Sequence, residues 1–408
     1  MSSEWLSMPF GDFLSLQRGH DLPEQERIKG DVPILGSFGV TGWHNKSLAK
    51  APGLTIGRSG ASFGTATYTE RDYFPLNTTL YVTDFKGSHP RFAYYFAEQF
   101  DFSAFNSGSA QPSLNRNYIN PVEVSIPPFS EQKAIAHILG TLDDKIELNR
   151  KTNETLEAMA KAIFKSWFVD FDPVRAKVEG RPTGLPAEIS DLFPDSFEDS
   201  ELGEIPSGWS VGEIQEIAEL NPETWGSRNQ PHGVRYLDLS NVKHGKIDSI
   251  EEYEWEDAPS RARRILITGD TVVGTVRPGN GSYCLIGEDG ITGSTGFAVL
   301  RPKNKSDSAF VYLGSCSKEN IDRLAHLADG GAYPAVRPEL VAQTPVIIAA
   351  RDLLDCFSRS VSPLFAAAEE RKQSSKLLCQ VRDALLPKLI SGEIRIPDAE
   401  KMLEEVGV

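Results

Sequence analysis

The sequence contains little cysteine and no long hydrophobic run. Its 4 cysteines form no CxxC pair. Their spacing indicates no disulfide framework and predicts reduced, mostly buried thiols in a cytoplasmic protein. No run of 18 apolar residues is present, and the N-terminus has no basic stretch followed by an apolar one. We therefore expect neither a membrane span nor a secretory signal.

The motifs of most catalytic sites are also missing. The 7 histidines show no HExxH or HxxxH spacing, so we expect no metal site. No phosphate-binding loop, no GxGxxG after a strand and no GxSxG elbow is present. Asn221–Thr224 (NPET) differs from the loop that amino-methyltransferases use on a flipped base. The carboxylates of Asp143 and Asp144 diverge as neighbours on a helix. We expect no catalytic residue and no cofactor in this chain, and favour a binding or scaffolding role.

The chain has a deficit of positive charge. Its 42 basic and 57 acidic side chains give a formal net charge of −15. A chain this acidic is not expected to bind DNA tightly alone, because the phosphates repel it. DNA binding needs a basic partner or a small local basic surface.

What the sequence does contain is a repeat with an offset of 222 residues. Residues 107–139 and 329–358 match, with Pro112 aligned to Pro334 and Leu114 to Val336. Each copy leads into a long amphipathic segment. We expect an α+β fold in which two mixed α/β domains are each followed by a long helix. The expected segments are a first domain (1–127), a helical region (128–168), a linker (169–200), a second domain (201–348) and a helical region with tail (349–408).

The two helical segments have apolar positions that alternate by three and four, which is typical of a coiled-coil seam. We predict that they pack as an antiparallel pair in a pseudo-twofold tandem repeat. The alternative is two surface helices on separate domains. We expect a kink or break near Gly140 and near Ser362, which precedes a proline. The predicted seam residues are Leu142, Ile146, Asn149, Leu156, Ile163, Trp167, Leu364, Leu378, Leu385 and Leu389.

Several segments resemble a known family. The stretch from GSAQPSLNRNYINPVEVSIPPF to KSWFVDFDPV resembles the central conserved region of specificity (S) subunits of type I restriction–modification systems. LGEIPSGW is similar to the start of their second target-recognition domain, and ALLPKLISGEIRI to their C-terminal conserved region. The resemblance implies a non-catalytic DNA-reading subunit with a bipartite, asymmetric target. It also implies two modification (M) subunits that use S-adenosylmethionine, and restriction (R) subunits, bound through them, that use ATP and Mg²⁺.

Residues for such a role should present paired hydrogen-bond donors to base edges. TIGRSGAS (55–62) and TVRPGNGS (275–282) align Arg58 with Arg277. The predicted DNA-binding residues lie in turn-like regions: Asn45, Lys46, Arg58, Ser59, Arg228, Asn229, Lys243, Arg263 and Arg277. The aromatic run RFAYYFAEQF (91–100) has helical spacing and is expected in the core rather than on a stacking surface.

Partners are expected on exposed helix positions and around Trp167–Asp172 and Leu385–Ile396. Two alternatives remain from the sequence. One is a coiled-coil scaffold that joins proteins without touching DNA, which the charge of −15 favours. The other is the specificity region of a fused methyltransferase, although no catalytic half is present.

Overall fold

A computed structural model describes residues 5–107, 112–201, 203–331 and 333–406. The chain forms two compact units. Unit 1 comprises Met1–Asn149 and Gln373–Val408, and unit 2 comprises Arg150–Lys372. Both units combine small sheets with helices, which confirms the expected mixed α/β character. None of the described helices is long and apolar enough to cross a membrane.

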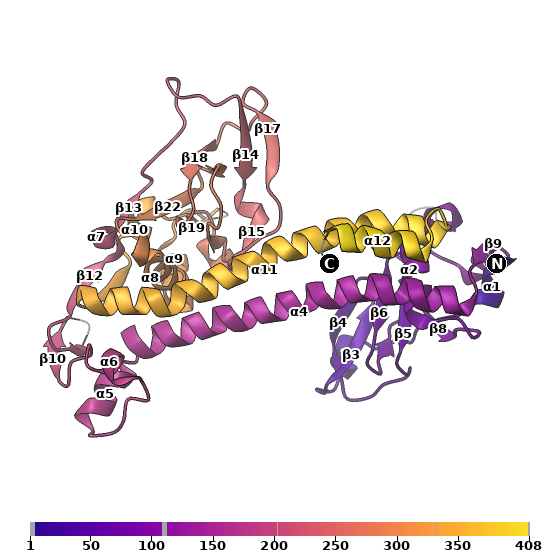
Figure 1. The fold of residues 1–408 in the computed structure, drawn as a ribbon, viewed down its shortest axis with the longest axis horizontal. Helices are drawn as coiled ribbons and strands as arrows, with labels where there is room; N and C mark the ends of the chain where they lie inside the picture. The colour runs from indigo at the N-terminus through magenta and orange to yellow at the C-terminus, as the bar shows by residue number, and fades with distance from the viewer. Residues whose placement is uncertain (1–4, 108–111, 202, 332, 407–408) are drawn as a thin grey trace. The chain divides into compact units, whose positions relative to one another are not determined.

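Two long helices supply the framework of both units. α4 (Phe129–Phe168) and α11 (Arg351–Ser391) each pass from one unit into the other, and Figure 1 shows them in magenta and yellow. Within unit 1 the two helices run antiparallel. Residues with decreasing numbers along α4 contact residues with increasing numbers along α11 and in the segment after it. These contacts are Asn149 with Ser375, Asp143 with Arg382, and Glu131 with Arg395. The predicted packing of the two helices is therefore confirmed.

The predicted seam in unit 1 is apolar with one polar layer. Leu142, Leu378, Leu385 and Leu389 are buried in one hydrophobic cluster, with Ile146 packed against it. Asn149 is buried among them, and its Nδ2 donates to Ser375 Oγ at 3.1 Å. A satisfied polar layer in an apolar seam fixes the register of two helices.

In unit 2 the helices close over an aromatic cluster. Trp167 is buried, with its ring centroid 5.8 Å from that of Phe357 on α11. Ile163 and Leu364 pack against the same cluster, whereas Leu156 is only half-buried. Trp167, Phe168 and Leu385, which belong to the expected docking segments, are core residues, whereas Val169 is exposed. The three core side chains fill the space between helix and sheet.

We expected a kink or break near Gly140 and near Ser362; a break is wrong, because both helices continue through these positions. Gly140 serves a close approach instead. Arg91 Nη2 donates to the Gly140 carbonyl at 3.2 Å, and a Cβ at Gly140 would lie 2.9 Å from Arg91 Cζ. Pro363 lies inside α11, where it costs the helix one backbone hydrogen bond.

The globular part of unit 1 begins and ends with paired strands. β1 (Leu6–Pro9) pairs antiparallel with β9 (Glu123–Ile126), directly before α4. Between them lie a four-stranded sheet of order β2-β8-β5-β6 and a three-stranded sheet of order β4-β3-β7. Their bounds are β2 Ser15–Arg18, β3 Val32–Gly36, β4 Gly39–His44, β5 Gly53–Gly57, β6 Ala66–Thr69, β7 Phe74–Pro75 and β8 Thr79–Asp84.

Unit 2 repeats this topology. β12 (Ser210–Glu213) pairs antiparallel with β23 (Pro345–Ile348), directly before α11. The sheet order β13-β22-β19-β20 corresponds to β2-β8-β5-β6, and the second sheet has the order β17-β14-β21-β18. In both units this second sheet contains one parallel pair, β3 with β7 and β14 with β21. The bounds are β13 Ala218–Leu220, β14 Gly233–Leu237, β17 Glu251–Glu254, β18 Ala262–Leu266, β19 Thr271–Gly274, β20 Tyr283–Leu285, β21 Ile291–Ser294 and β22 Phe297–Pro302. The predicted tandem repeat is therefore present at the level of topology.

The aromatic segment of unit 1 lies in the core, as predicted. It forms α2 (Pro90–Gln99), which begins with Pro90 at its first position and His89 Nδ1 accepting from the Phe92 amide at 3.4 Å. Phe92, Tyr95 and Phe96 are buried against α1 (Phe10–Phe13) and the sheet. The helix therefore has no aromatic face available for stacking on bases.

The expected linker, residues 169–200, is ordered and contributes to the core of unit 2. It contains α5 (Asp172–Val178), α6 (Ala187–Ser190) and β10 (Phe197–Ser200), which pairs with β11 (Gly203–Pro206). Phe171, Val174 and Phe193 are buried with Trp209. Aromatic residues among the prolines anchor this segment, which a composition of Pro and Gly alone does not predict.

Candidate nucleic-acid interface

Unit 1 contains a polar cleft of about 620 Å³ where three elements end or begin. Arg18 is the last residue of β2, Arg58 follows β5, and Arg116 is the first residue of α3 (Arg116–Ile119). An isolated bridge between Ser59 and Ser113 joins the loop after β5 to the segment before α3. Arg18, Arg58 and Arg116 all line the cleft, and we refer to it as the arginine cleft.

Arg58 is held firmly at the floor of the arginine cleft. Its amide donates to the Thr78 carbonyl and its own carbonyl accepts from Leu114 N, each at 2.8 Å. Its Nε donates to the Asn77 carbonyl at 3.2 Å. The side chain is half-buried, and burial, followed by the charge of Arg18, lowers the pKa of the Arg58 guanidinium. An Arg pKa remains far above neutral pH, so the lowered value indicates a cation whose surroundings do not compensate its charge.

Arg18 and Arg116 are exposed at the edge of the cleft. Arg116 Nη1 donates to the Leu16 carbonyl at 2.9 Å, and Arg18 lies 3.9 Å from Asp21. Among the described residues that line the cleft, Asp21 is the only carboxylate against three guanidinium groups. The cleft is therefore a small basic surface in a chain of net charge −15.

The other candidates of unit 1 differ in placement. Asn45 and Lys46 follow β4 and are exposed, so both can reach a ligand. Ser59 is half-buried next to Arg58 and pairs with Ser113. The structure therefore brings Arg58 and Ser59 together, and nothing in the described contacts places Asn45 or Lys46 in the arginine cleft.

The candidates of unit 2 do not converge on one cleft. Arg228 is exposed in a loop, and Lys243 is exposed in the hairpin of β15 (Val242–Lys243) and β16 (Lys246–Ile247). Asn229 supports the loop that carries it, because its Oδ1 accepts from Gly226 N at 2.7 Å. The Arg263 guanidinium lies 4.6 Å from the centre of the Trp255 ring. Arg228 and Lys243 are free to contact a ligand, whereas Asn229 and Arg263 have structural contacts.

Arg277 lies at an exposed turn with a left-handed backbone, φ 47°. Its guanidinium lies 4.7 Å from the centre of the exposed Tyr333 ring, and its amide donates to the Pro334 carbonyl at 2.7 Å. A guanidinium placed over an aromatic ring is attracted by a cation–π contact. Unit 2 therefore presents an Arg277–Tyr333 pair at its surface.

The sequence alignment of Arg58 with Arg277 is wrong by two residues. Leu114 N donates to the Arg58 carbonyl, and the matching Val336 N donates to that of Thr275. Gly57 and Gly274 likewise end corresponding strands, β5 and β19. Thr275 is therefore the counterpart of Arg58, and Arg277 corresponds to Gly60, whose φ is also positive at 83°. The two segments have similar sequences around their arginines, which suggested a wrong register between the repeats. The hydrogen bonds of the paired strands set the correct one.

The same correspondence shows that unit 2 lacks the arginine cleft. Strand register matches Leu16 with Leu220 and hence Arg18 with Pro222. The first residues of the equivalent helices, α3 and α10 (Pro338–Ala342), are Arg116 and Pro338. All three arginines of unit 1 are replaced by uncharged residues. The two units therefore share a framework and differ in the chemistry at the same place on it.

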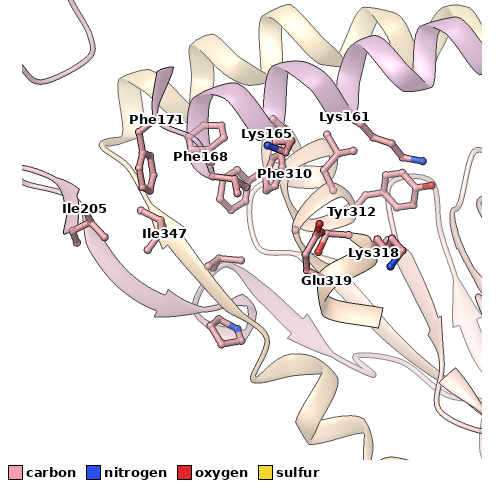
Figure 2. Close-up of a pocket in the computed structure, with 18 of the residues that line it drawn as sticks. Lys161, Lys165, Phe168, Phe171, Ile205, Phe310, Tyr312, Lys318, Glu319 and Ile347 are labelled. Carbon is pink, nitrogen blue, oxygen red and sulfur yellow. The ribbon is translucent and has the colours of Figure 1, made fainter. Parts of the chain in front are cut away.

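A second hollow, of about 700 Å³, lies in unit 2 and is apolar. Figure 2 shows the rings of Phe168, Phe171 and Phe310 along it, with Lys161, Lys165 and Lys318 at its edge. Each lysine is already paired with a carboxylate, Lys161 with Glu157, Lys165 with Asp170, and Lys318 with Asp322. The hollow therefore offers apolar contact and little net positive charge, which does not suit nucleic acid.

Sequence reasoning missed Arg18, Arg116 and Tyr333. Arg116 and Tyr333 lie in the repeated stretches, but their nearness to Arg58 and Arg277 comes from the fold, as does the place of Arg18 at the end of β2. The offset of 222 residues could have found Arg116, because it lies directly after the matched pair Leu114 and Val336. Within the matched stretches 107–139 and 329–358, residues 108–111 and 332 lie outside the described residues.

Comparison with known proteins finds similarity to one group of DNA-specificity proteins. Residues 2–158 match the type I restriction modification DNA specificity domain. The specificity subunit of the type I restriction enzyme HindI from Haemophilus influenzae is 27% identical over 73% of this chain and 74% of its own. That of MjaIX from Methanocaldococcus jannaschii is 23% identical over 72% and 65%.

The chain is therefore similar to type I restriction–modification specificity subunits, and its residues 2–158 match their DNA specificity domain. The crystal structure of the S subunit from M. genitalium has the same fold, with a TM-score of 0.61 over 95% of this chain and 96% of that one, at 16% identity. This identity is low, so the likeness concerns the fold alone.

Proposed function

We propose that this chain is a specificity (S) subunit that reads a bipartite, asymmetric DNA target and holds the modification and restriction subunits on it. One observation carries the proposal. Two units with one topology present different side chains at matched positions, namely Arg18, Arg58 and Arg116 against Pro222, Thr275 and Pro338. A dimer of identical readers requires a palindrome, whereas two unlike readers in one chain fit two unlike half-sites.

The subunit itself performs no chemistry in this proposal. Two M subunits would supply S-adenosylmethionine-dependent methylation, and R subunits bound through them would supply cleavage that depends on ATP and Mg²⁺, in the cytoplasm. The M subunits would also neutralise much of the DNA phosphate charge, which an acidic chain does not do well alone. Exposed apolar side chains on the long helices, such as Leu148, Met159 and Leu377, support a docking role for these helices.

The test is a selection from randomised duplex DNA, with and without co-expressed M subunit. We expect the complex to enrich one gapped motif with two different halves, and the S subunit alone to bind weakly. If the complex enriches no motif, the DNA-reading proposal is wrong and the alternative of a protein scaffold without DNA contact gains support. A palindromic motif would contradict the asymmetry alone.

A further inference from the structure

The arginine cleft gathers three positive charges, and the described residues that line it do not neutralise all of them. Arg18, Arg58 and Arg116 line one cleft, and Asp21 is the only described carboxylate lining it. The pair of Arg18 and Asp21 is long, at 3.9 Å, and both side chains are mostly exposed. Like charges gathered at a cleft cost free energy unless a ligand supplies acceptors. The cleft therefore suits a ligand rich in anionic or carbonyl oxygens.

The three arginines are held differently, which suggests different tasks. Arg58 is half-buried, and its Nε is used by the Asn77 carbonyl. This bond fixes the plane of the guanidinium and leaves its two Nη groups for a ligand. Arg18 and Arg116 are exposed at the edge of the cleft, where they can follow the ligand's backbone.

We propose that Arg58 reads a guanine in one half-site and that Arg18 and Arg116 bind the phosphates beside it; this rests on the proposed function. A fixed pair of Nη donors matches guanine O6 and N7, which accept side by side in the major groove. Phosphates accept from exposed arginines without regard to sequence. Because unit 2 has Thr275, Pro222 and Pro338 at the matched positions, the guanine read in this way lies in only one half-site.

The experiment uses the complex with M subunits and labelled duplexes of the enriched motif. We expect Arg58→Ala to lose preference at one base pair of one half-site by roughly 10- to 100-fold, with the other half-site unchanged. Arg18→Ala and Arg116→Ala should weaken binding to all sequences alike. Each should also lower the slope of log affinity against log salt by about 0.9.

Arg71→Ala is the matched control. Arg71 belongs to the same unit, lies outside the cleft, and contacts Asp31 and the Trp43 ring. We expect an unchanged motif and salt slope. If Arg58→Ala lowers the melting temperature, Arg58→Lys replaces it, because lysine keeps the charge and loses the paired donors.

The outcomes separate this inference from the proposed function. If the wild-type complex enriches a gapped motif and both Arg58 variants keep every base preference, the guanine assignment is overturned and the DNA-reading function stands. If the Arg58 variants weaken all sequences equally, Arg58 is a phosphate contact and the assignment is again overturned. If the wild-type complex enriches no motif, the proposed function itself fails.

Discussion

At the scale of single residues, some buried charged groups support the framework through several hydrogen bonds. Asp270 in unit 2 is the clearest case, because its side chain is only 1% exposed. Both its oxygens accept from Arg301, from Nε and Nη2, at 2.9 Å each, and Oδ2 also accepts from the Ile267 amide. Burial raises the pKa of Asp270, while Arg301 opposes the rise.

We predict that Arg301→Met lowers the free energy of unfolding of unit 2 by about 3–5 kcal/mol, because it leaves a buried carboxylate unpaired. Without Arg301 the pKa of folded Asp270 rises further above that of the unfolded chain. The folded variant then binds the extra proton, and its stability falls as pH rises between these two pKa values. Denaturation by urea at about pH 5 and about pH 8 should show the larger deficit at the higher pH.

Arg261→Met is the control for this prediction. Arg261 is 62% exposed and lies 3.5 Å from Asp238, so its loss should cost about 1 kcal/mol or less. Equal losses in the two variants, or a deficit in Arg301→Met that does not change with pH, would show that Asp270 is not the group responsible.

Residue predictions from sequence succeeded where local chemistry was sufficient. Arg58 was found because an arginine in a turn after a strand is visible in one short segment. Arg18 and Arg116 were missed because they join Arg58 only through the pairing of β2 with β8 and the bridge from Ser59 to Ser113. Whether the predicted contact residues bind DNA remains a prediction.

At the scale of elements, side chains connect the globular part of unit 1 to its two helices. Asp143 on α4 accepts from Tyr95 Oη of α2 and from Arg382 Nη1 of α11. One half-buried carboxylate thus joins three helices. Asp144, its neighbour, accepts from Arg91 at 2.7 and 3.0 Å and is 69% exposed.

We predict that Asp143→Ala destabilises unit 1 by about 1–3 kcal/mol, because it leaves the Tyr95 hydroxyl and Arg382 without their acceptor in a half-buried place. Asp144→Ala should cost less, about 1 kcal/mol, because Asp144 is mostly exposed and Arg91 keeps the Gly140 carbonyl as an acceptor. Thermal melting of both variants measures the difference. A larger loss for Asp144→Ala would contradict the conclusion that Asp143 joins α2 and α11 to α4.

Elements were predicted well where periodicity is long and poorly where one residue type was given too much weight. The alternation of apolar positions gave the two helices and their seam. Gly140 and Pro363 suggested breaks, yet hydrogen bonds on either side and the packing of Arg91 on Gly140 keep the helices continuous. A glycine can leave room for a guanidinium or can end a helix. The sequence does not distinguish these two roles, because it does not show which side chain packs against the glycine.

At the scale of the whole molecule, α4 and α11 are the only described helices that belong to both units. Their length is therefore expected to set the spacing between the two half-sites. Seven residues add about 10.5 Å to a helix, and one base pair occupies about 3.4 Å along DNA. A heptad keeps the apolar seam in register.

We predict that inserting one heptad into both helices, after Asn149 and after Lys372, lengthens the unread gap by about three base pairs and leaves both half-sites unchanged. Methylation patterns of cells that carry the variant complex measure the gap. A control insertion of seven residues at the exposed turn residue Gly87 should leave the gap as it is. A changed half-site sequence with an unchanged gap would contradict the ruler role of the helices.

The paired strands at the start and end of each globular part have a consequence for how new specificities arise. Because β1 lies against β9, and β12 against β23, the polypeptide enters and leaves each reader at one place. Genetic exchange of everything between such a pair would install a foreign reader without altering the helices. Diversity of recognised sequence can then grow by shuffling whole cassettes, while the docking of enzymatic partners is inherited intact.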